Sequence, residues 1–160
     1  MADVPRRPRA ADSVPGMFIE IVAEVTDALV EAYQRLTPQL SKSNPPPDRE
    51  ALEDIVAATA TDMFIATDDD GTILGTSTLA VFRIPTGRRA WIEDVVVDEA
   101  GRGLGIGGAL TRAMVDRAAE LGCTTVDLTS RPSREAANRL YVREGFEVRE
   151  TNVYRRTLES

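Results

Sequence analysis

The chain contains no histidine and only one cysteine, Cys123, and these absences exclude several kinds of site. Without histidine there can be no Ser-His or Cys-His catalytic pair, and most zinc sites lose a usual ligand. A single cysteine cannot form an intramolecular disulfide, which fits a reducing cytoplasm. Because Cys123 follows the end of an expected helix, a small buried residue explains it better than a nucleophile does.

Long apolar runs are missing as well. No stretch approaches the roughly 20 apolar residues that span a bilayer, and the N-terminus lacks the apolar segment of a signal peptide. We therefore expect a cytoplasmic protein with no membrane partner. The formal net charge of −7 argues against nucleic acid as the main partner.

The negative charge is concentrated in the first half of the chain. Residues 17–71 hold 12 acidic and 3 basic residues, whereas from Thr72 onward 13 arginines face 12 acids. This asymmetry would suit a cationic ligand beside an anionic one, and an acidic surface that only confers solubility explains it equally well. Three of the acids, Asp68 to Asp70, stand before Gly71 and predict a tight turn rather than a metal site.

The length of 160 residues suits one domain with a substantial core. Residues 1–16 hold three prolines and three arginines among few apolar residues, which predicts a disordered N-terminal leader. Residues 17–160 then form a single domain.

Apolar periodicity predicts alternating strands and helices of the α/β class. Strands are expected at 18–22, 63–67, 73–82, 90–97, 125–129, 146–150 and 153–158, and helices at 26–36, 48–60, 106–121 and 134–144. Prolines 45–47 cannot continue a helix, so we expect a loop from Thr37 to Asp48 between the first two helices.

The most informative stretch is Trp91 to Leu110, WIEDVVVDEAGRGLGIGGAL. An apolar strand leads into a turn with five glycines within eight residues, and the turn leads into a helix. Free N–H groups at a helix start converge at the positive end of the helix dipole and bind anions. The alternative to an anion site is that the glycines only shape a tight connection between strand and helix. A phosphate site explains their number better, because a Cβ would keep a bulky pyrophosphate away.

One phosphate-binding motif that fits is the dinucleotide fingerprint. Gly103-x-Gly105-x-x-Gly108 satisfies it, and Asp127 follows 24 residues after Gly103. A dinucleotide-binding domain, however, normally begins with this motif and then adds several βα units. Here the motif arrives after residue 100, so a dinucleotide-binding module is disfavoured.

A second motif fits better. Arg102-x-x-Gly105-x-Gly107, directly after a Val-x-Val strand end, resembles the coenzyme A pyrophosphate loop of the GNAT N-acetyltransferase superfamily. The block 138–146, NRLYVREGF, resembles the second motif of that superfamily. The resemblance extends over most of Phe18 to Leu158. It implies the GNAT fold, an α/β fold with a central mixed sheet of six to seven strands and about four helices, in the order β-α-α-β-β-β-α-β-α-β-β.

The resemblance also implies acetyl-CoA as co-substrate and no metal. In the family, the strand before the loop splays from its neighbour, and its free backbone groups bind the pantetheine arm. The implied donor-binding residues are Val95, Val96, Val97, Arg102, Gly103, Leu104, Gly105, Ile106, Gly107 and Gly108. Among them, Arg102 adds positive charge, and an amide near Val97 polarises the thioester carbonyl.

Tyr141 matches the family tyrosine that protonates the departing thiolate. The assignment is chemically reasonable, since a phenol and a thiol have reference pKa values of about 10 and about 8.5. A tyrosine that only packs under the sheet is the alternative. The family often carries an asparagine seven residues earlier, where this chain has Arg134. Asn138 lies on the same helical face, so either Asn138 replaces that asparagine or Arg134 reaches a phosphate.

For the general base, Glu93 is our first candidate and Asp94 our second, because several family members place a carboxylate on this strand. Strict alternation puts the two on opposite faces, with Glu93 on the face of Val95 and Val97. A carboxylate that anchors a neighbouring loop explains either residue equally well, and some members have no dedicated base.

Together these residues predict direct acetyl transfer from acetyl-CoA to a primary amine, in a small molecule or at a peptide N-terminus, with a cationic acceptor favoured. One alternative is a non-catalytic acyl-CoA-binding regulator, which would need neither Tyr141 nor Glu93. Another is an amino-sugar phosphate acetyltransferase, whose sequences resemble 92–97 and 121–123. Oligomeric state stays open, with a homodimer as one option because dimers are common in the superfamily.

Overall fold

The computed structural model describes residues 14–158, so the expected leader lies outside the described residues except for its last three. The elements along the chain are β1 (Met17–Ile21), α1 (Asp27–Leu40), α2 (Arg49–Ala57), β2 (Thr61–Asp68), β3 (Ile73–Ile84), β4 (Gly87–Val97), the 3-10 turn η1 (Glu99–Gly101), α3 (Ile106–Glu120), β5 (Thr125–Asp127) and α4 (Glu135–Arg143). The four expected helices and the expected order up to α4 are therefore confirmed.

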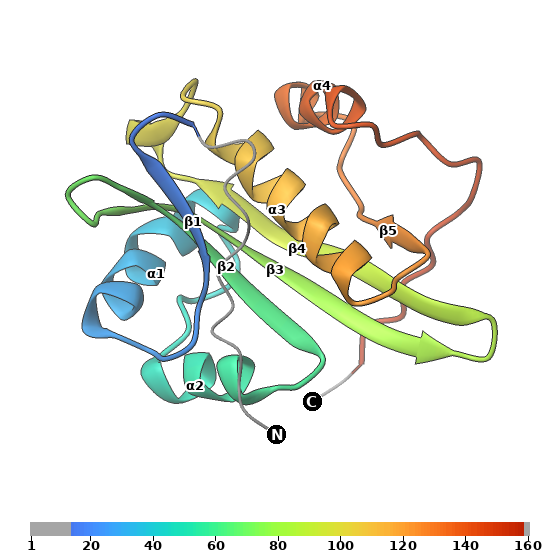
Figure 1. Cartoon of the computed structure of the whole chain (residues 1–160), viewed down its shortest axis with the longest axis horizontal. Helices are drawn as coiled ribbons and strands as arrows, with labels where there is room; N and C mark the ends of the chain where they lie inside the picture. The colour runs from blue at the N-terminus through green and yellow to red at the C-terminus, as the bar shows by residue number, and fades with distance from the viewer. Residues whose placement is uncertain (1–13, 159–160) are drawn as a thin grey trace.

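The sheet has five strands in the order β1-β2-β3-β4-β5. Its first four strands pair antiparallel and β5 pairs parallel with β4, which confirms a mixed sheet. Helices α1 and α2 lie on one face and α3 lies on the other (Figure 1).

Each face of the sheet has its own core. On the α3 face, Phe64, Leu79 and Ile92 pack with Leu110 and Met114 of α3. On the α1 face, Met63 and Val96 pack with residues of α1 and α2 that include Leu29, Leu36 and Leu52. Neighbours in one strand, such as Met63 and Phe64, point into different cores, as the period of two requires.

Two side chains cap the helices of the first half. The Thr26 hydroxyl accepts a hydrogen bond from the N–H of Leu29 (3.2 Å), and Asp48 Oδ1 accepts one from Ala51 (2.9 Å). Helix α1 continues through Pro38 to Leu40, so the expectation that the loop begins at Thr37 is wrong. Pro38 stands in the last turn, where its missing N–H costs one helical hydrogen bond without ending the helix.

Strand β4 is paired on its β5 side over a short stretch. Only Arg89 to Trp91 have partners in β5, namely Thr125 to Asp127. From Ile92 to Val97 that edge has no strand partner among the described residues. The two strands therefore diverge toward the glycine-rich turn, as the family resemblance implies.

A β-bulge interrupts β4 at Asp94. Val96 pairs with Thr76 and Glu93 pairs with Thr78, so two residues of β4 stand opposite Ser77 alone. Asp94 has a φ of 53°, in the left-handed region that aspartate tolerates better than most residues.

The bulge shifts the alternation of side chains. Ile92, Val95 and Val97 all pack against the core on the α3 face, whereas Val96 belongs to the core on the α1 face. Glu93 follows Ile92 in the regular part of the strand and so points to the α1 face. The expectation that Glu93 shares a face with Val95 and Val97 is therefore wrong, because it assumed strict alternation through the bulge.

The expected strands at 146–150 and 153–158 do not form, and the sheet has five strands rather than six or seven. Val148, Val153, Tyr154 and Leu158 stay between 66% and 93% exposed. A strand needs a partner edge, and this segment pairs with none of the described strands. The apolar pattern of residues 146–158 alone does not determine whether the segment finds a strand to pair with.

The acidic turn between β2 and β3 is organised by its own backbone. Asp68 Oδ1 accepts hydrogen bonds from the N–H groups of Asp70 (3.0 Å) and Thr72 (2.8 Å). Within residues 14–158, no three acidic or cysteine side chains are grouped so that they could hold a metal ion. In the same range, no helix is both long and apolar enough to cross a membrane.

Candidate functional site

The start of α3 presents several backbone N–H groups that have no acceptor within residues 14–158. Gly103 and Gly105 both have a φ of 81°, and Gly105 precedes the first helical residue, Ile106. The first N–H bonded at this helix start is that of Ala109, which donates to the Gly105 carbonyl (3.0 Å). In the part of the chain that the structure describes, the N–H groups of Gly103, Gly105, Ile106, Gly107 and Gly108 have no acceptor. This geometry can bind an anion through several N–H groups at once.

The glycines of this connection also allow close packing. A Cβ on Gly101 would stand 2.7 Å from Ile106 Cδ1, and a Cβ on Gly108 would stand 2.8 Å from Glu144 Oε1 of the segment that ends α4. By contrast, no atom of residues 14–158 lies within 4 Å of a Cβ built on Gly103. The glycines thus serve both helix packing and the open approach to the free N–H groups.

Three elements meet at Gly107. A Cβ there would stand 3.1 Å from Leu140 Cδ1 of α4 and 3.8 Å from Val97 Cγ2 at the end of β4. Helix α4, the glycine-rich loop and the end of β4 therefore meet at Gly107, and Tyr141, the expected proton donor, directly follows Leu140 in α4. An ion pair from Arg112 of α3 to Glu144 (2.8 Å) holds α4 in this position.

Arg102 stands at the entrance to this site. Its side chain is 60% exposed and forms an ion pair with Glu99 at 3.7 Å. Leu104, two residues later, is also exposed. An exposed pair of this kind is weak, so Arg102 can turn toward an incoming phosphate at little cost.

Tyr141 is half-buried and packs edge-on against Phe146, with ring centroids 6.0 Å apart. Burial raises the pKa of its hydroxyl above the ordinary value, and the positive charge of Arg134 works weakly in the opposite direction. The phenol therefore stays protonated at neutral pH, which a general acid requires.

Arg134 and Asn138 differ in what they contact. Asn138 Nδ2 donates a hydrogen bond to the Arg131 carbonyl (2.9 Å) and so holds the segment before α4. Arg134 precedes the first residue of α4 and lies close enough to Tyr141 to affect its pKa. The side chain of Asn138 is therefore engaged in holding the segment before α4, whereas that of Arg134 makes no such bond among the described residues.

The two carboxylates of β4 also have different surroundings. Glu93 Oε1 accepts a hydrogen bond from the indole N–H of Trp91 (2.8 Å) on the same face. Asp94 lies near Tyr33 of α1. Burial raises the pKa of the Tyr33 hydroxyl, the Thr76 side chain lowers it, and the charge of Asp94 raises it further. Both carboxylates are exposed, so either can meet an amine on the α1 face.

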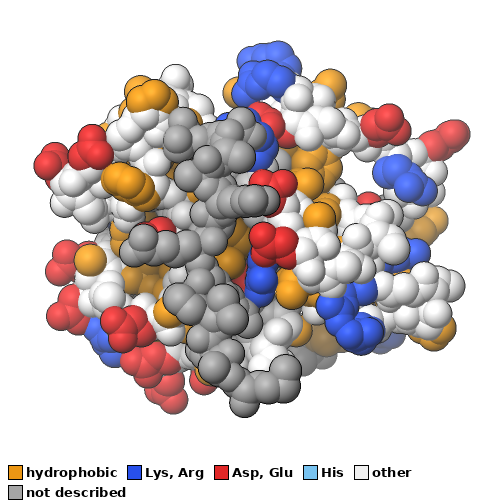
Figure 2. Space-filling model, viewed as in Figure 1, with side chains coloured by type: hydrophobic (Ala, Val, Ile, Leu, Met, Phe, Trp, Pro, Cys, Tyr) orange, Lys and Arg blue, Asp and Glu red, His pale blue; other side chains and the backbone are white. Residues whose placement is uncertain are grey.

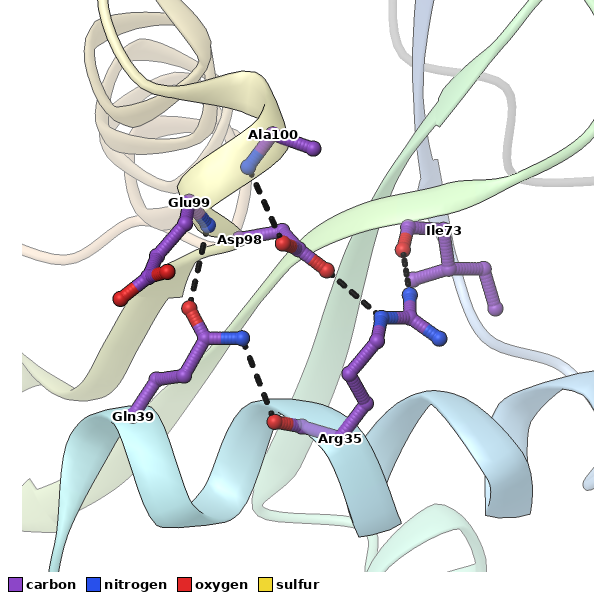
Figure 3. A network of polar contacts seen from close by, with 6 residues as sticks. All are labelled: Arg35, Gln39, Ile73, Asp98, Glu99 and Ala100. Atoms are coloured by element: carbon purple, nitrogen blue, oxygen red, sulfur yellow. Dashed lines mark hydrogen bonds and ion pairs between the residues drawn. The ribbon is translucent and has the colours of Figure 1, made fainter.

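Sequence reasoning missed the residues that connect α1 with the glycine-rich turn. Arg35 and Gln39 of α1 bond to Asp98 and Glu99 at the beginning of that turn (Figure 3). Asp98 could have been noticed as a turn-capping residue after a strand. Its partner Arg35, which is 63 positions away, leaves no local signal.

Cys123 is partly buried, and burial raises the pKa of its thiol. A raised pKa reduces the thiolate fraction, so the structure gives this cysteine no nucleophilic character.

Comparison with known families agrees with this geometry. The model of the Acetyltransferase (GNAT) family matches residues 26–146. The chain belongs to the GNAT acetyltransferase family. The match includes both the glycine-rich loop and Tyr141, and the family resemblance seen in the sequence is confirmed.

Solved structures of several acetyltransferases share this GNAT fold. An aminoglycoside acetyltransferase from an uncultured soil metagenomic sample is 24% identical, with a TM-score of 0.78 over 91% of this chain and 98% of that one. Glucosamine-6-phosphate N-acetyltransferase from Arabidopsis thaliana is 20% identical, with a TM-score of 0.72 over 86% and 97% of the two chains. A transcriptional regulator from Bacillus halodurans is 24% identical, with a TM-score of 0.72 over 87% and 99%. No curated protein matches the chain in sequence.

Proposed function

We propose that this GNAT protein transfers the acetyl group of acetyl-CoA to a primary amine by direct attack in a ternary complex. The observation that carries the proposal is the set of N–H groups at Gly103 and from Gly105 to Gly108, which have no acceptor within residues 14–158 and lie beside the helix of Tyr141. A pyrophosphate needs such a row of donors, and departure of a thiolate needs a proton donor. The contact of Leu140 with Gly107, which joins the helix of Tyr141 to the loop, supports the proposal.

The residues divide the binding of the donor among them. The free N–H groups at the start of α3 bind the pyrophosphate, and Arg102 adds positive charge. The unpaired edge of β4, from Val95 through Val96 to Val97, bonds the pantetheine arm as a neighbouring strand would. Among the described residues, no atom lies within 4 Å of a Cβ built on Gly103, which leaves room for a phosphate to approach, so the residues present fit this ligand.

The chemical step forms one bond and breaks another. The amine nitrogen attacks the thioester carbon while the amide near Val97 polarises the carbonyl oxygen. The carbon–sulfur bond then breaks, and Tyr141 donates its proton to the thiolate. The amine gives up a proton to Glu93 or Asp94, directly or through water.

We further propose that the acceptor is a cationic amine, small or at a peptide N-terminus. Acidic side chains predominate over α1 and α2 (Figure 2), and Glu93 and Asp94 are exposed on the same side of the sheet. Negative potential there attracts a cation. Structures of similar fold include an aminoglycoside acetyltransferase in complex with sisomicin, which supports the class of acceptor.

A single experiment distinguishes this function from two other candidates. An amino-sugar phosphate acetyltransferase would prefer an anionic acceptor, and a non-catalytic regulator would bind acetyl-CoA without turnover. Thiol release from acetyl-CoA should be measured with a panel of cationic, neutral and phosphorylated amines. Our proposal expects turnover with cationic amines first. Acetyl-CoA binding without turnover on any amine would favour the regulator.

A further inference from the structure

The connection between β4 and α3, residues 98–105, has little apolar contact to hold it in place. Asp98 and Gly101 are buried, and the other six residues are exposed. A site that binds an anion through backbone N–H groups works well only if those groups already point at the ligand. Something other than core packing must therefore fix the beginning of this connection.

Asp98 is the first anchor. Its Oδ1 accepts a hydrogen bond from the N–H of Ala100 (3.1 Å), which caps the η1 turn, and its backbone N–H donates to the Leu74 carbonyl of β3 (2.8 Å). Its Oδ2 accepts a hydrogen bond from Arg35 Nε of α1 at 2.6 Å. The Arg35 guanidinium also donates through Nη2 to the Ile73 carbonyl (2.6 Å) (Figure 3). One arginine thus ties α1 to both β3 and the turn.

Gln39 is the second anchor and lies one helical turn after Arg35 on the same face of α1. Its Oε1 accepts a hydrogen bond from the N–H of Glu99 (3.0 Å), and its Nε2 donates to the Arg35 carbonyl (3.3 Å). Glu99 in turn pairs with Arg102, which stands at the entrance to the anion site. Helix α1 therefore holds two consecutive residues at the beginning of the loop.

We propose that Arg35 and Gln39 are positioning residues for the donor, because they fix the loop whose N–H groups bind the pyrophosphate of acetyl-CoA. This inference rests on the proposed function. Neither side chain bonds to the free N–H groups, so both act through Asp98 and Glu99. The ionised state of Asp98 belongs to the same arrangement, since the hydrogen bond from Arg35 holds the pKa of that carboxyl below its usual value.

The chain offers a matched control for a purely structural effect. Arg117 of α3 donates through Nε to Asp62 of β2 at 2.7 Å, an ion pair of similar geometry that also joins a helix to the sheet. Arg117 lies 12 residues after Gly105, or about 18 Å along the helix, at the end remote from the anion site. Loss of this pair should destabilise the fold without disturbing the loop.

The test compares Arg35→Met, Gln39→Leu and Arg117→Met with the wild type. Acetyl-CoA affinity is measured by calorimetry, unfolding by urea, and kcat and KM by thiol release. We expect acetyl-CoA binding to weaken about tenfold in Arg35→Met and about threefold in Gln39→Leu, with kcat at saturating acetyl-CoA within about twofold of wild type. Arg35→Lys keeps the charge but not the two-pronged geometry, so its affinity should fall between Arg35→Met and wild type. Arg117→Met should lose stability and keep its affinity.

Gln39→Leu keeps the test decisive if Arg35→Met fails to fold, because Gln39 is only half-buried. Wild-type affinity in a folded Gln39→Leu and a folded Arg35→Lys would overturn the inference alone. An equal loss of affinity in Arg117→Met would also overturn it, since the effect would then follow stability rather than the loop. Failure of the wild type to bind acetyl-CoA would overturn the proposed function itself, and the inference with it.

Discussion

At the scale of single residues, Tyr141 and Asp94 have the most unusual surroundings. Tyr141 is held against Phe146 and keeps its proton because burial raises its pKa. Asp94 adopts a left-handed backbone at a bulge in the pairing of β4 with β3. The role proposed for Tyr141 is chemical, whereas the residue type at position 94 is constrained by backbone conformation. Substitutions can separate these two kinds of role.

Tyr141→Phe should lower turnover by roughly ten- to a thousandfold and change acetyl-CoA affinity little, because it removes a proton donor used mainly in the transition state. Steady-state kinetics and calorimetry on one preparation measure both effects. Tyr154→Phe is the matched control, since that tyrosine is 89% exposed. Unchanged turnover in Tyr141→Phe would assign the proton to another donor, such as water.

The pH profile of the wild type tests the same residue. A required acid is lost as pH rises through its pKa, and burial moves the pKa of Tyr141 upward. The alkaline fall in kcat that depends on Tyr141 should therefore lie above about pH 10, the ordinary value for tyrosine. A fall near neutral pH that disappears in Tyr141→Phe would contradict the raised pKa.

For Asp94 we predict a stability order set by the backbone. Glycine and asparagine tolerate a left-handed φ, whereas alanine pays about 1 kcal/mol for it. Asp94→Gly and Asp94→Asn should therefore unfold in urea near the wild-type midpoint, and Asp94→Ala should lose about 1 kcal/mol. Glu93→Ala, at an ordinary backbone position one residue earlier, serves as the control. Equal stability of the alanine and glycine variants at Asp94 would show that the bulge imposes no such constraint.

At the scale of elements, the start of α3 is the proposed binding site for the pyrophosphate of acetyl-CoA. Gly105→Asp should abolish acetyl-CoA binding, because it adds a negative charge beside the N–H groups that receive phosphate. Gly105→Asn is the matched control, since asparagine has nearly the same shape, carries no charge and tolerates the φ of 81°. Calorimetry should show much weaker binding for aspartate than for asparagine. Similar affinity in both variants would place the pyrophosphate elsewhere.

The loop after α1 is the element most suited to contact the acceptor. Residues 41–48 follow the end of α1, contain three prolines and carry mostly polar side chains. Stiff loops on a rigid scaffold often set specificity. Replacing 41–44 with glycines, beyond the Gln39 contact, should raise the acceptor KM and leave acetyl-CoA affinity unchanged. A change in acetyl-CoA affinity alone would place this loop on the donor side.

Most of these elements could be predicted from local sequence. Thr26 and Asp48 marked helix starts, and the glycine-rich turn after Val97 located the start of α3, because caps and turns depend on neighbours in the chain. The bulge at Asp94 could not be predicted, since it depends on how β3 pairs with β4. The strands expected after Phe146 were wrong for a similar reason, because pairing with an edge is a property of the whole fold.

In the candidate site, too, some features could be predicted from local sequence and others depend on the fold. Tyr141 and the loop were each predicted from a motif whose own residues lie close together in the sequence. The contact of Gly107 with Leu140 and the bond from Arg35 to Asp98 join positions far apart in the sequence. Such pairs carry no local pattern, so only the folded chain reveals them.

At the scale of the whole molecule, charge is distributed unevenly between the two halves of the chain. The 12 acids and 3 bases of residues 17–71 include those of α1 and α2, which cover one face of the sheet. A cationic acceptor should therefore be attracted over several ångströms, and salt should screen this attraction. We predict that the KM of a cationic amine rises when the salt concentration is raised from about 50 to about 500 mM, because salt screens the attraction. The KM of a neutral amine should change little. An equal response of both amines would argue against electrostatic recognition.

The reaction proposed for the site around Gly107 is direct transfer of acetyl from acetyl-CoA to an amine. The most direct test is the initial rate of thiol release by the wild-type protein while acetyl-CoA and a cationic amine are varied together. We predict release that requires the amine, saturates with both substrates and gives intersecting double-reciprocal lines, as a ternary complex demands. Binding of acetyl-CoA with no amine-dependent release on any amine tested would contradict the claim, and parallel lines would contradict direct transfer.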